Sequence, residues 1–198
     1  MLGGLLFTPQ CLGCQKIGCH ICQGCRTQLR PRQFELPESR LLVWVAGDYE
    51  GWLRDAIVRF KTGSRGQIPG LARLICDDLP INSTIVSVPT STHKVRERGF
   101  DSIDLLCRQI VRLRRDVTYF PVLRLHRPVL DQVGLSAAKR QANLKGAVIS
   151  KMPISGSFVV IDDVVTTGST VQECARALKF AGAEEVLAYS VSASVNRG

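Results

Sequence analysis

Short apolar runs alternate along this chain with segments whose apolar positions recur at helical spacing. The apolar runs predict buried strands at residues 41–46, 84–88, 117–123, 158–161 and 186–192. The helical periodicity predicts helices at residues 52–60, 68–79, from about 101 onward and at 171–181, with Gly182 as the stop of the last one. Alternating strands and helices predict an α/β domain with a mostly parallel sheet flanked by helices, in which ligands bind beyond the carboxyl ends of the strands.

The first forty residues differ in character from the rest. Residues 1–30 contain a cluster of cysteines, whereas residues 31–40 are polar and include Pro31 and Pro37, which is typical of a linker. We therefore expect a cysteine-rich zinc-binding module at 1–30, a linker at 31–40 and the α/β domain at 41–198. A chain of 198 residues is long enough for one typical domain with a small appendage.

Polar residues with useful chemistry follow the predicted strand at 158–161. Asp162 and Asp163 come directly after it, and a hydroxyl-rich turn at 166–170 leads into the last predicted helix. The N–H groups and dipole at a helix start attract phosphate, Gly168 permits close approach of the backbone, and hydroxyls add donors. Carboxylates accept hydrogen bonds from ribose, and Mg²⁺ shared with a pyrophosphate would offset their charge. The segment predicts a phosphosugar site; the alternative is an ordinary strand exit with a capped helix.

Five of the eight cysteines lie within fifteen residues. Cys11 and Cys14 form one C-x-x-C pair, and Cys22 and Cys25 form a second. Two such pairs can close a tetrahedral zinc site, and a module this small usually needs a metal to fold. We therefore predict that these four cysteines hold a structural Zn²⁺, with a redox pair or a remnant without metal as the alternatives.

The ligand set is open at one point. Cys19 also forms a C-x-x-C pair with Cys22, and His20 is a further donor, so either residue could replace one of the four cysteines. Structural disulfides are not expected in a reducing cytosol. The other three cysteines lie in apolar helical patterns and are predicted to be buried in the core.

The net charge of +9 indicates an anionic partner. Nine of the 26 basic residues lie between Lys94 and Arg127, against four acids. This stretch would attract phosphates on a small ligand or on nucleic acid, or it forms a solvated basic face. The N-terminal apolar segment is short and lacks a basic start, and no other uncharged stretch approaches 18 residues. We expect a cytoplasmic protein without a membrane span.

Residues 88–101 leave a predicted strand and carry several basic side chains. Arg96 and Arg98 flank Glu97, so in an extended loop both guanidinium groups point the same way. Such a pair could clamp a pyrophosphate through charge-assisted hydrogen bonds. An exposed basic loop without a ligand is the alternative.

The acidic pair and hydroxyl-rich turn resemble the signature with which type I phosphoribosyltransferases bind 5-phosphoribosyl 1-pyrophosphate (PRPP). The whole chain resembles the ComF family, which pairs such a domain with a cysteine-rich N-terminus and is linked to DNA uptake in natural competence. Residues 88–101 are similar to the family's R-x-R-G-F-N element, with Asp101 where Asn is usual. A spaced series around Arg140 also resembles the family, and lies where phosphoribosyltransferases carry a mobile loop that closes over the ligand.

The resemblance implies a type I phosphoribosyltransferase-like fold, and PRPP or another phosphorylated ribose, with Mg²⁺, as the ligand. Asp162 and Asp163 would contact the ribose hydroxyls, and the turn would hold the 5′-phosphate. The residues expected to bind PRPP are Lys61, Arg140, Asp162, Asp163, Val164, Thr166, Thr167, Gly168, Ser169 and Thr170. The residues expected to act in catalysis are Arg96, Arg98, Asp162 and Asp163.

Two functions follow from these expectations. An enzyme would transfer the phosphoribosyl group from PRPP to an acceptor and displace pyrophosphate from the anomeric carbon, although no acceptor pocket is evident in the sequence. The alternative is a catalytically inactive module that binds phosphate or single-stranded DNA and couples to a competence helicase and channel. In either case the resemblance implies a role in DNA uptake.

Overall fold

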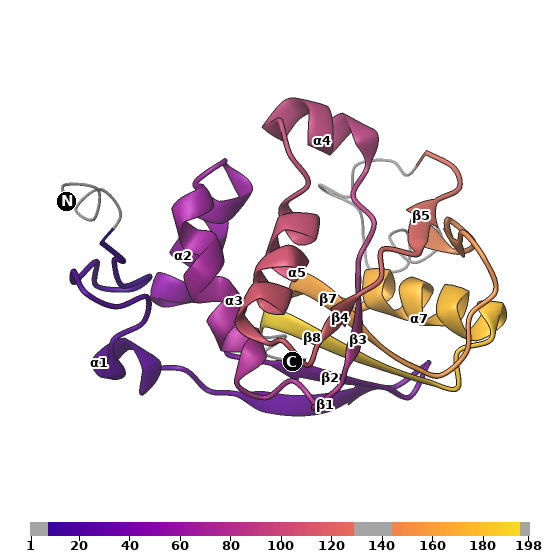
Figure 1. The fold of residues 1–198 in the computed structure, drawn as a ribbon, viewed down its shortest axis with the longest axis horizontal. Coiled ribbons are helices and arrows are strands. Elements are labelled where there is room, and N and C mark those ends of the chain that lie inside the picture. Colours follow the sequence, from indigo (N-terminus) through magenta and orange to yellow (C-terminus); the bar gives the residue numbers. More distant parts are fainter. Residues whose placement is uncertain (1–7, 129–143, 195–198) are drawn as a thin grey trace.

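A mostly parallel sheet of six strands forms the centre of the computed structural model, which describes residues 8–128 and 144–194 (Figure 1). The strands are, in spatial order, β1 (Arg32–Leu36), β2 (Leu41–Val45), β8 (Glu185–Ala193), β7 (Ser157–Val165), β3 (Thr84–Ser87) and β4 (Thr118–Tyr119). β1 is antiparallel to β2, and the other neighbours in this sheet are parallel. The predicted α/β fold class is confirmed.

Helices cover both faces of the sheet. One face carries α2 (Gly51–Lys61), α3 (Ile68–Cys76) and α5 (Ser102–Leu113), and the other carries α7 (Ser169–Ala181) (Figure 1). The short helices are α1 (Gln23–Arg26), η1 (Arg65–Gln67) and α4 (Thr92–Arg98). A separate two-stranded sheet of β5 (Leu123–Leu125) and β6 (Val148–Ser150) packs against α7.

The apolar runs divide their side chains between two cores. Successive residues of a strand point to opposite faces of the sheet. In β7, Val159 and Ile161 therefore pack with α2, α3 and α5, whereas Val160 packs with α7. Both faces are buried, which explains why the central strands are continuous apolar runs rather than alternating ones.

The segment predicted as a linker contains strand β1. Its Phe34 and Leu36 alternate with polar residues, and the strand pairs with β2 from Arg32 opposite Val45 to Leu36 opposite Leu41. Pairing with the neighbouring strand therefore overrides the two prolines, which flank β1 and leave its interior N–H groups intact. The proposed division into three parts stays a prediction.

The cysteine-rich segment packs directly on two helices of the sheet domain. Leu12 is buried against α3, where a Cβ on Gly70 would lie 2.6 Å from its Cγ. The Arg59 guanidinium on α2 donates a hydrogen bond to the Leu12 carbonyl at 2.9 Å, and Arg26 forms an ion pair with Asp77. The glycine at position 70 is needed for this close packing.

Three element boundaries differ from the sequence-based expectation. β7 continues past Ile161 to Val165, because it keeps pairing with β8 as far as Ala193. The strand predicted at 117–123 is broken after Tyr119, where Pro121 has no N–H to donate. α3 ends at Cys76, before the predicted end at residue 79. None of the helices in the described ranges has the length and apolar character needed to cross a bilayer.

Candidate functional site

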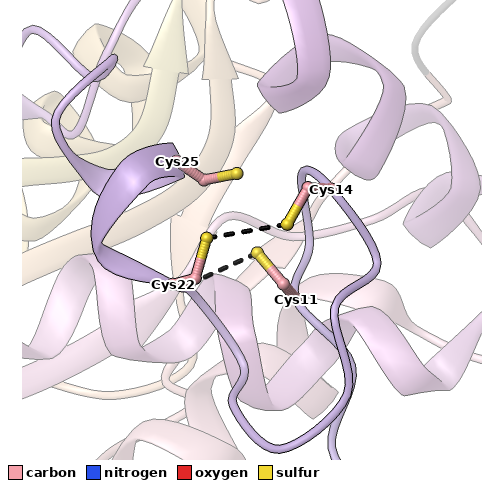
Figure 2. Close-up of side chains that lie close together, drawn as sticks. All are labelled: Cys11, Cys14, Cys22 and Cys25. Atoms are coloured by element: carbon pink, nitrogen blue, oxygen red, sulfur yellow. Dashed lines mark hydrogen bonds between the residues drawn. The ribbon is translucent and has the colours of Figure 1, made fainter.

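The sulfur atoms of Cys11, Cys14, Cys22 and Cys25 lie close together (Figure 2). Cys11 and Cys14 come from a loop, whereas Cys22 caps the short helix α1 and Cys25 lies within it. All four lie within 4.8 Å of one another, and the Sγ atoms of Cys14 and Cys22 are 3.6 Å apart. Tetrahedral zinc with Zn–S bonds of about 2.3 Å requires sulfur atoms about 3.8 Å apart. The four-cysteine cluster is therefore compatible with a structural Zn²⁺.

Backbone N–H groups around the cluster favour a thiolate at Cys11. The Cys22 N–H donates to the Cys11 Sγ at 3.3 Å, and the Cys11 N–H donates to the Lys16 carbonyl at 2.9 Å. Burial opposes ionisation of Cys11, but N–H groups of Cys22, Cys14 and Gly13 lower its pKa to about 6. The thiolate is the form that binds a metal.

Cys19 and His20 lie outside the cluster in the described part of the chain. His20 contributes to the loop through its backbone, because its carbonyl accepts a hydrogen bond from the Leu12 N–H at 2.9 Å. The geometry therefore favours the two C-x-x-C pairs over the alternatives that the sequence left open.

A cavity of about 190 Å³ opens where β3 and β7 end. We call it the acidic cavity. Charged and hydroxyl side chains from four separate parts of the chain line it: Lys61, Thr90, Ser91, Lys94, Arg98, Ser102, Asp162, Asp163 and Thr170. The carboxyl edge of a parallel sheet is where ligands bind in open α/β folds.

Lys61 and the two aspartates form one electrostatic unit in the acidic cavity. The Lys61 Nζ lies 2.9 Å from the Asp163 Oδ1, and Asp163 is buried. Burial opposes the charge on Lys61, but Asp163, and more weakly Asp162, raise its pKa. The sequence predicted that Lys61 binds PRPP; in the structure Lys61 forms an ion pair with one of the two carboxylates.

The second carboxylate is less well compensated. The Asp162 Oδ1 accepts the Asp163 N–H at 2.8 Å. Burial, and then the charge of Asp163, raise the pKa of Asp162 to about 7. With this pKa, the Asp162 carboxyl gains or loses its proton near neutral pH. A ligand that donates hydrogen bonds to it or brings a cation would favour the ionised form.

The hydroxyl-rich turn is divided between two hollows. Thr170 lines the acidic cavity, whereas Thr166 and Thr167 line a hollow of about 630 Å³ that also contains Arg30 and Arg32. The Thr167 and Ser169 hydroxyls lie 2.8 Å apart and bond to each other. The predicted turn residues therefore do not all face one cavity.

Gly168 and Val164 have packing roles in this arrangement. Gly168 has φ 79°, a left-handed conformation, and a Cβ there would lie 2.6 Å from the Leu36 Cδ1. The sequence suggested that this glycine lets the backbone approach an anion; the structure shows a close approach to strand β1. Val164 packs against the core on the side of α2, α3 and α5.

The condition under which Arg96 and Arg98 would point the same way, an extended loop, is not met, because residues 92–98 form helix α4. The Ser91 hydroxyl accepts the Lys94 N–H, and Gly99 ends the helix with φ 76°. Residues two apart do not share a helix face, so Arg96 and Arg98 cannot point the same way. Arg98 lines the acidic cavity, whereas Arg96 is exposed and does not. Arg140 lies outside the described residues.

Sequence reasoning missed three hydroxyl residues of the acidic cavity: Thr90, Ser91 and Ser102. A signal for the first two was present, because the run Thr90-Ser91-Thr92 directly follows Pro89 at the end of β3. Asp101 holds this corner together, since its Oδ1 accepts hydrogen bonds from the Thr90 hydroxyl and from the N–H groups of Ile103 and Asp104.

Comparison with known proteins gives several related sequences, although no family model matches the chain. DNA utilization protein YhgH of Salmonella typhi is 35% identical over 161 residues, which cover 76% of this chain and 70% of that protein. YhgH of Escherichia coli K12 is 36% identical over the same extent. Competence protein F of Haemophilus influenzae is 30% identical over 162 residues, covering 75% of this chain and 71% of that protein.

Proposed function

The chain belongs to the ComF family, and from this premise we propose that it binds PRPP with Mg²⁺ in the acidic cavity and serves in DNA uptake in the cytoplasm. The names of its relatives, a competence protein and DNA utilization proteins, support the DNA-related role. The observation that carries the ligand proposal is the joint placement of Lys61, Asp162 and Asp163 at the end of β7.

The acidic cavity offers a partner for each part of PRPP. Carboxylates of Asp162 and Asp163 would accept hydrogen bonds from the ribose hydroxyls, which are donors. The start of α7, with the Thr170 hydroxyl, would hold the 5′-phosphate at its N–H groups. Lys61 and Arg98 would face the pyrophosphate, to which Mg²⁺ would supply further positive charge.

As an enzyme, the protein would act chiefly by positioning the sugar. A bond would form between the anomeric carbon and an acceptor atom while the bond to pyrophosphate breaks, through a transition state with positive charge on the sugar ring. The carboxylates of Asp162 and Asp163 would stabilise that charge, and the cations would stabilise the departing pyrophosphate. Arg96 is exposed, so we give the catalytic contact to Arg98.

The second candidate function is a module without turnover that binds single-stranded DNA and couples to a competence helicase. The basic stretch from Lys94 to Arg127 favours it. Arg108 and Arg114 are paired with Asp104 and Asp116, but the exposed Arg112 and Arg115 have no carboxylate among their described contacts. Binding of this kind weakens steeply with salt, with a slope of about 0.7 per neutralised phosphate on a log–log plot.

Calorimetric titration with PRPP and Mg²⁺ tests the first proposal. We expect the parent protein to bind and the Asp162→Ala/Asp163→Ala variant to bind about a hundredfold more weakly, since two charged hydrogen-bond acceptors are lost. Asp55→Ala is the matched control, because it removes an exposed carboxylate on α2 that does not line the cavity. Equal binding by all three proteins, or none, would contradict the assignment.

Release of pyrophosphate separates the two functions. An enzyme releases pyrophosphate from PRPP in the presence of one acceptor from a panel of bases, amines and oligonucleotides. The module binds single-stranded DNA with a strong salt dependence and releases no pyrophosphate under any of these conditions.

A further inference from the structure

A second, larger cavity of about 880 Å³ adjoins the acidic cavity. The two share the walls formed by Pro89, Thr90, Ser91 and Leu125. We call the larger one the tyrosine cavity, because Tyr119 of β4 lines it. A volume of this size is typical of sites for small organic ligands. The predicted ligand residues of the PRPP site, Lys61, Asp162 and Asp163, line the acidic cavity alone.

One side of the tyrosine cavity carries an ordered chain of hydrogen bonds. The Tyr119 hydroxyl donates to the Asp104 Oδ1 at 2.9 Å, and Arg108 donates to the other oxygen of Asp104 at 2.7 Å. The single proton of the Tyr119 hydroxyl is thereby used, so the Ser87 hydroxyl, 2.9 Å away, must donate to it. Ser87 then offers a hydrogen-bond acceptor to any ligand in the cavity.

The Tyr119 hydroxyl in this hydrogen-bond chain stays neutral. Burial, above all, raises the pKa of Tyr119 well above its usual range, so its hydroxyl keeps its proton. Asp104 accepts from two protein donors and forms an ion pair with Arg108, and Asp101 is occupied in capping α5. The two acids of the tyrosine cavity are thus already engaged within the protein.

The rest of the lining combines apolar walls with a basic edge. Pro89, Pro121 and Leu123 supply flat or apolar surface. Arg124, His126 and Lys151 lie at exposed positions along the edge. This combination suits a ligand with a flat ring, a hydrogen-bond donor on the ring and a separate negative charge.

We propose that the tyrosine cavity binds a nucleotide, with its base against the proline walls and the Ser87 hydroxyl and its phosphate at Arg124. The base of a nucleotide has a flat apolar face and N–H donors along its rim. The 5′-phosphate of the nucleotide carries the negative charge that the basic side chains of the cavity attract. The shared wall places this nucleotide beside the ligand of the acidic cavity. A free nucleotide and the terminal nucleotide of a DNA strand present the same chemistry.

Calorimetric titration of the full-length protein with the four ribonucleoside and four deoxyribonucleoside 5′-monophosphates tests the proposal. The corresponding nucleosides and inorganic phosphate are titrated at the same salt concentration. We expect at least one nucleotide to bind about tenfold more tightly than its nucleoside, since a charged hydrogen bond is gained. A short single-stranded oligonucleotide with a 5′-phosphate distinguishes a strand end from a free nucleotide.

Three variants locate the binding. Arg124→Ala should weaken nucleotide binding about tenfold and leave nucleoside binding unchanged, because it removes only the phosphate contact. Ser87→Ala should weaken the binding of both the nucleotide and the nucleoside severalfold. Arg115→Ala is the matched control, since it removes an exposed arginine at the turn before β4 and outside the cavity lining, and it should bind like the parent.

The outcomes are distinct from those of the PRPP titration. Nucleotide binding that persists in Lys61→Ala, and in the presence of PRPP, supports a separate site even if PRPP itself fails to bind. The proposal is overturned if no nucleotide binds at millimolar concentration, if inorganic phosphate binds as tightly as the nucleotides, or if Arg124→Ala and Ser87→Ala bind as the parent does. Displacement of the nucleotide by PRPP in the parent protein would also overturn it.

Discussion

The cysteine cluster and the acidic cavity are assembled in opposite ways. All four cysteines come from residues 11–25, and one tight loop and the short helix α1 bring their sulfur atoms together. The acidic cavity instead joins Lys61 at the end of α2, Arg98 at the end of α4 and Asp163 near the end of β7. A local motif can specify the first site, whereas the second exists only once the sheet has formed.

Helix α2 connects the two regions. Arg59, in its last turn, bonds the Leu12 carbonyl of the cysteine-rich segment, and Lys61 at its end pairs with Asp163. The packing of Leu12 against Gly70 adds a second contact with the helical layer. The comparison therefore predicts an asymmetry: damage to the cluster should reach the cavity, but damage to the cavity should leave the cluster intact.

Loss of a cluster cysteine should have the largest effect. Cys22→Ser should abolish binding of one zinc ion per chain and lower the free energy of unfolding by about 5 kcal/mol or more, since a structural metal contributes its binding energy to folding. Metal analysis and chemical denaturation measure both. Cys19→Ser is the control and should keep the metal, because Cys19 lies outside the cluster.

The same experiment tests the asymmetry. Cys22→Ser should also weaken PRPP binding, because α2 loses its support on the Leu12 side. A Cys22→Ser protein that lacks zinc but unfolds at the same denaturant concentration as the parent would show that the cluster has no structural role. Loss of zinc in Cys19→Ser would show that the ligand set is different.

Removal of Lys61 should have the next largest effect. Lys61→Met leaves the buried Asp163 without its cation and beside Asp162, so we expect the free energy of unfolding to fall by about 1–3 kcal/mol, because Lys61 itself is partly exposed. The zinc content should stay unchanged. Lys145→Met, at an exposed position, is the control and should have the stability of the parent.

A second substitution sharpens this result. Asp163→Asn in the Lys61→Met background removes the uncompensated charge and should restore part of the lost stability, as chemical denaturation would measure. Equal stability of the single and double variants would mean that the ion pair contributes nothing to folding.

The elevated pKa of Asp162 predicts a pH-dependent stability. In the unfolded chain an aspartate has a pKa of about 3.9. Between about pH 4 and pH 7, Asp162 therefore holds a proton in the folded protein that it has lost in the unfolded chain. This contribution to stability is therefore present at low pH and is lost as the pH rises toward 7, after which it stays constant. Asp162→Asn has no carboxyl group to protonate at this position, so its stability should not fall in this way as the pH rises.

Chemical denaturation of both proteins at several pH values checks the sign. The stability of Asp162→Asn relative to the parent should increase by about 2 kcal/mol at most between pH 5.5 and 7 and then level off. Asp55→Asn is the control, and its difference from the parent should not vary in this way. A constant difference for Asp162→Asn would show that the pKa is not raised.

The same contrast explains what the sequence could predict. The C-x-x-C pairs, the buried strands around Val160 and the helix after Gly168 depend on neighbours in the chain, and they were identified. The Lys61–Asp163 pair, the division of Thr167 and Thr170 between two hollows, and the contact of Gly168 with Leu36 depend on distant parts of the chain, and periodicity carries no information about them. Helix α4 is not among the predicted helices, although Gly99 in the left-handed conformation is a typical stop signal at its end.

Asp101 offers the smallest and most specific test of the corner beside the acidic cavity, where its carboxylate accepts a hydrogen bond from the Thr90 hydroxyl. Its Oδ1 accepts three hydrogen bonds, including two from the first N–H groups of α5, and an asparagine oxygen can accept the same three. Asp101→Asn should therefore change the free energy of unfolding by less than about 0.5 kcal/mol, whereas Asp101→Ala should lower it by about 1 kcal/mol.

The Asn variant also removes one negative charge near the proposed anion sites. Calorimetry should therefore show PRPP binding strengthened by about twofold at low salt and unchanged at high salt, because salt screens the interaction between separated charges. Weaker binding by the Asn variant would mean that the carboxylate itself takes part in holding the ligand.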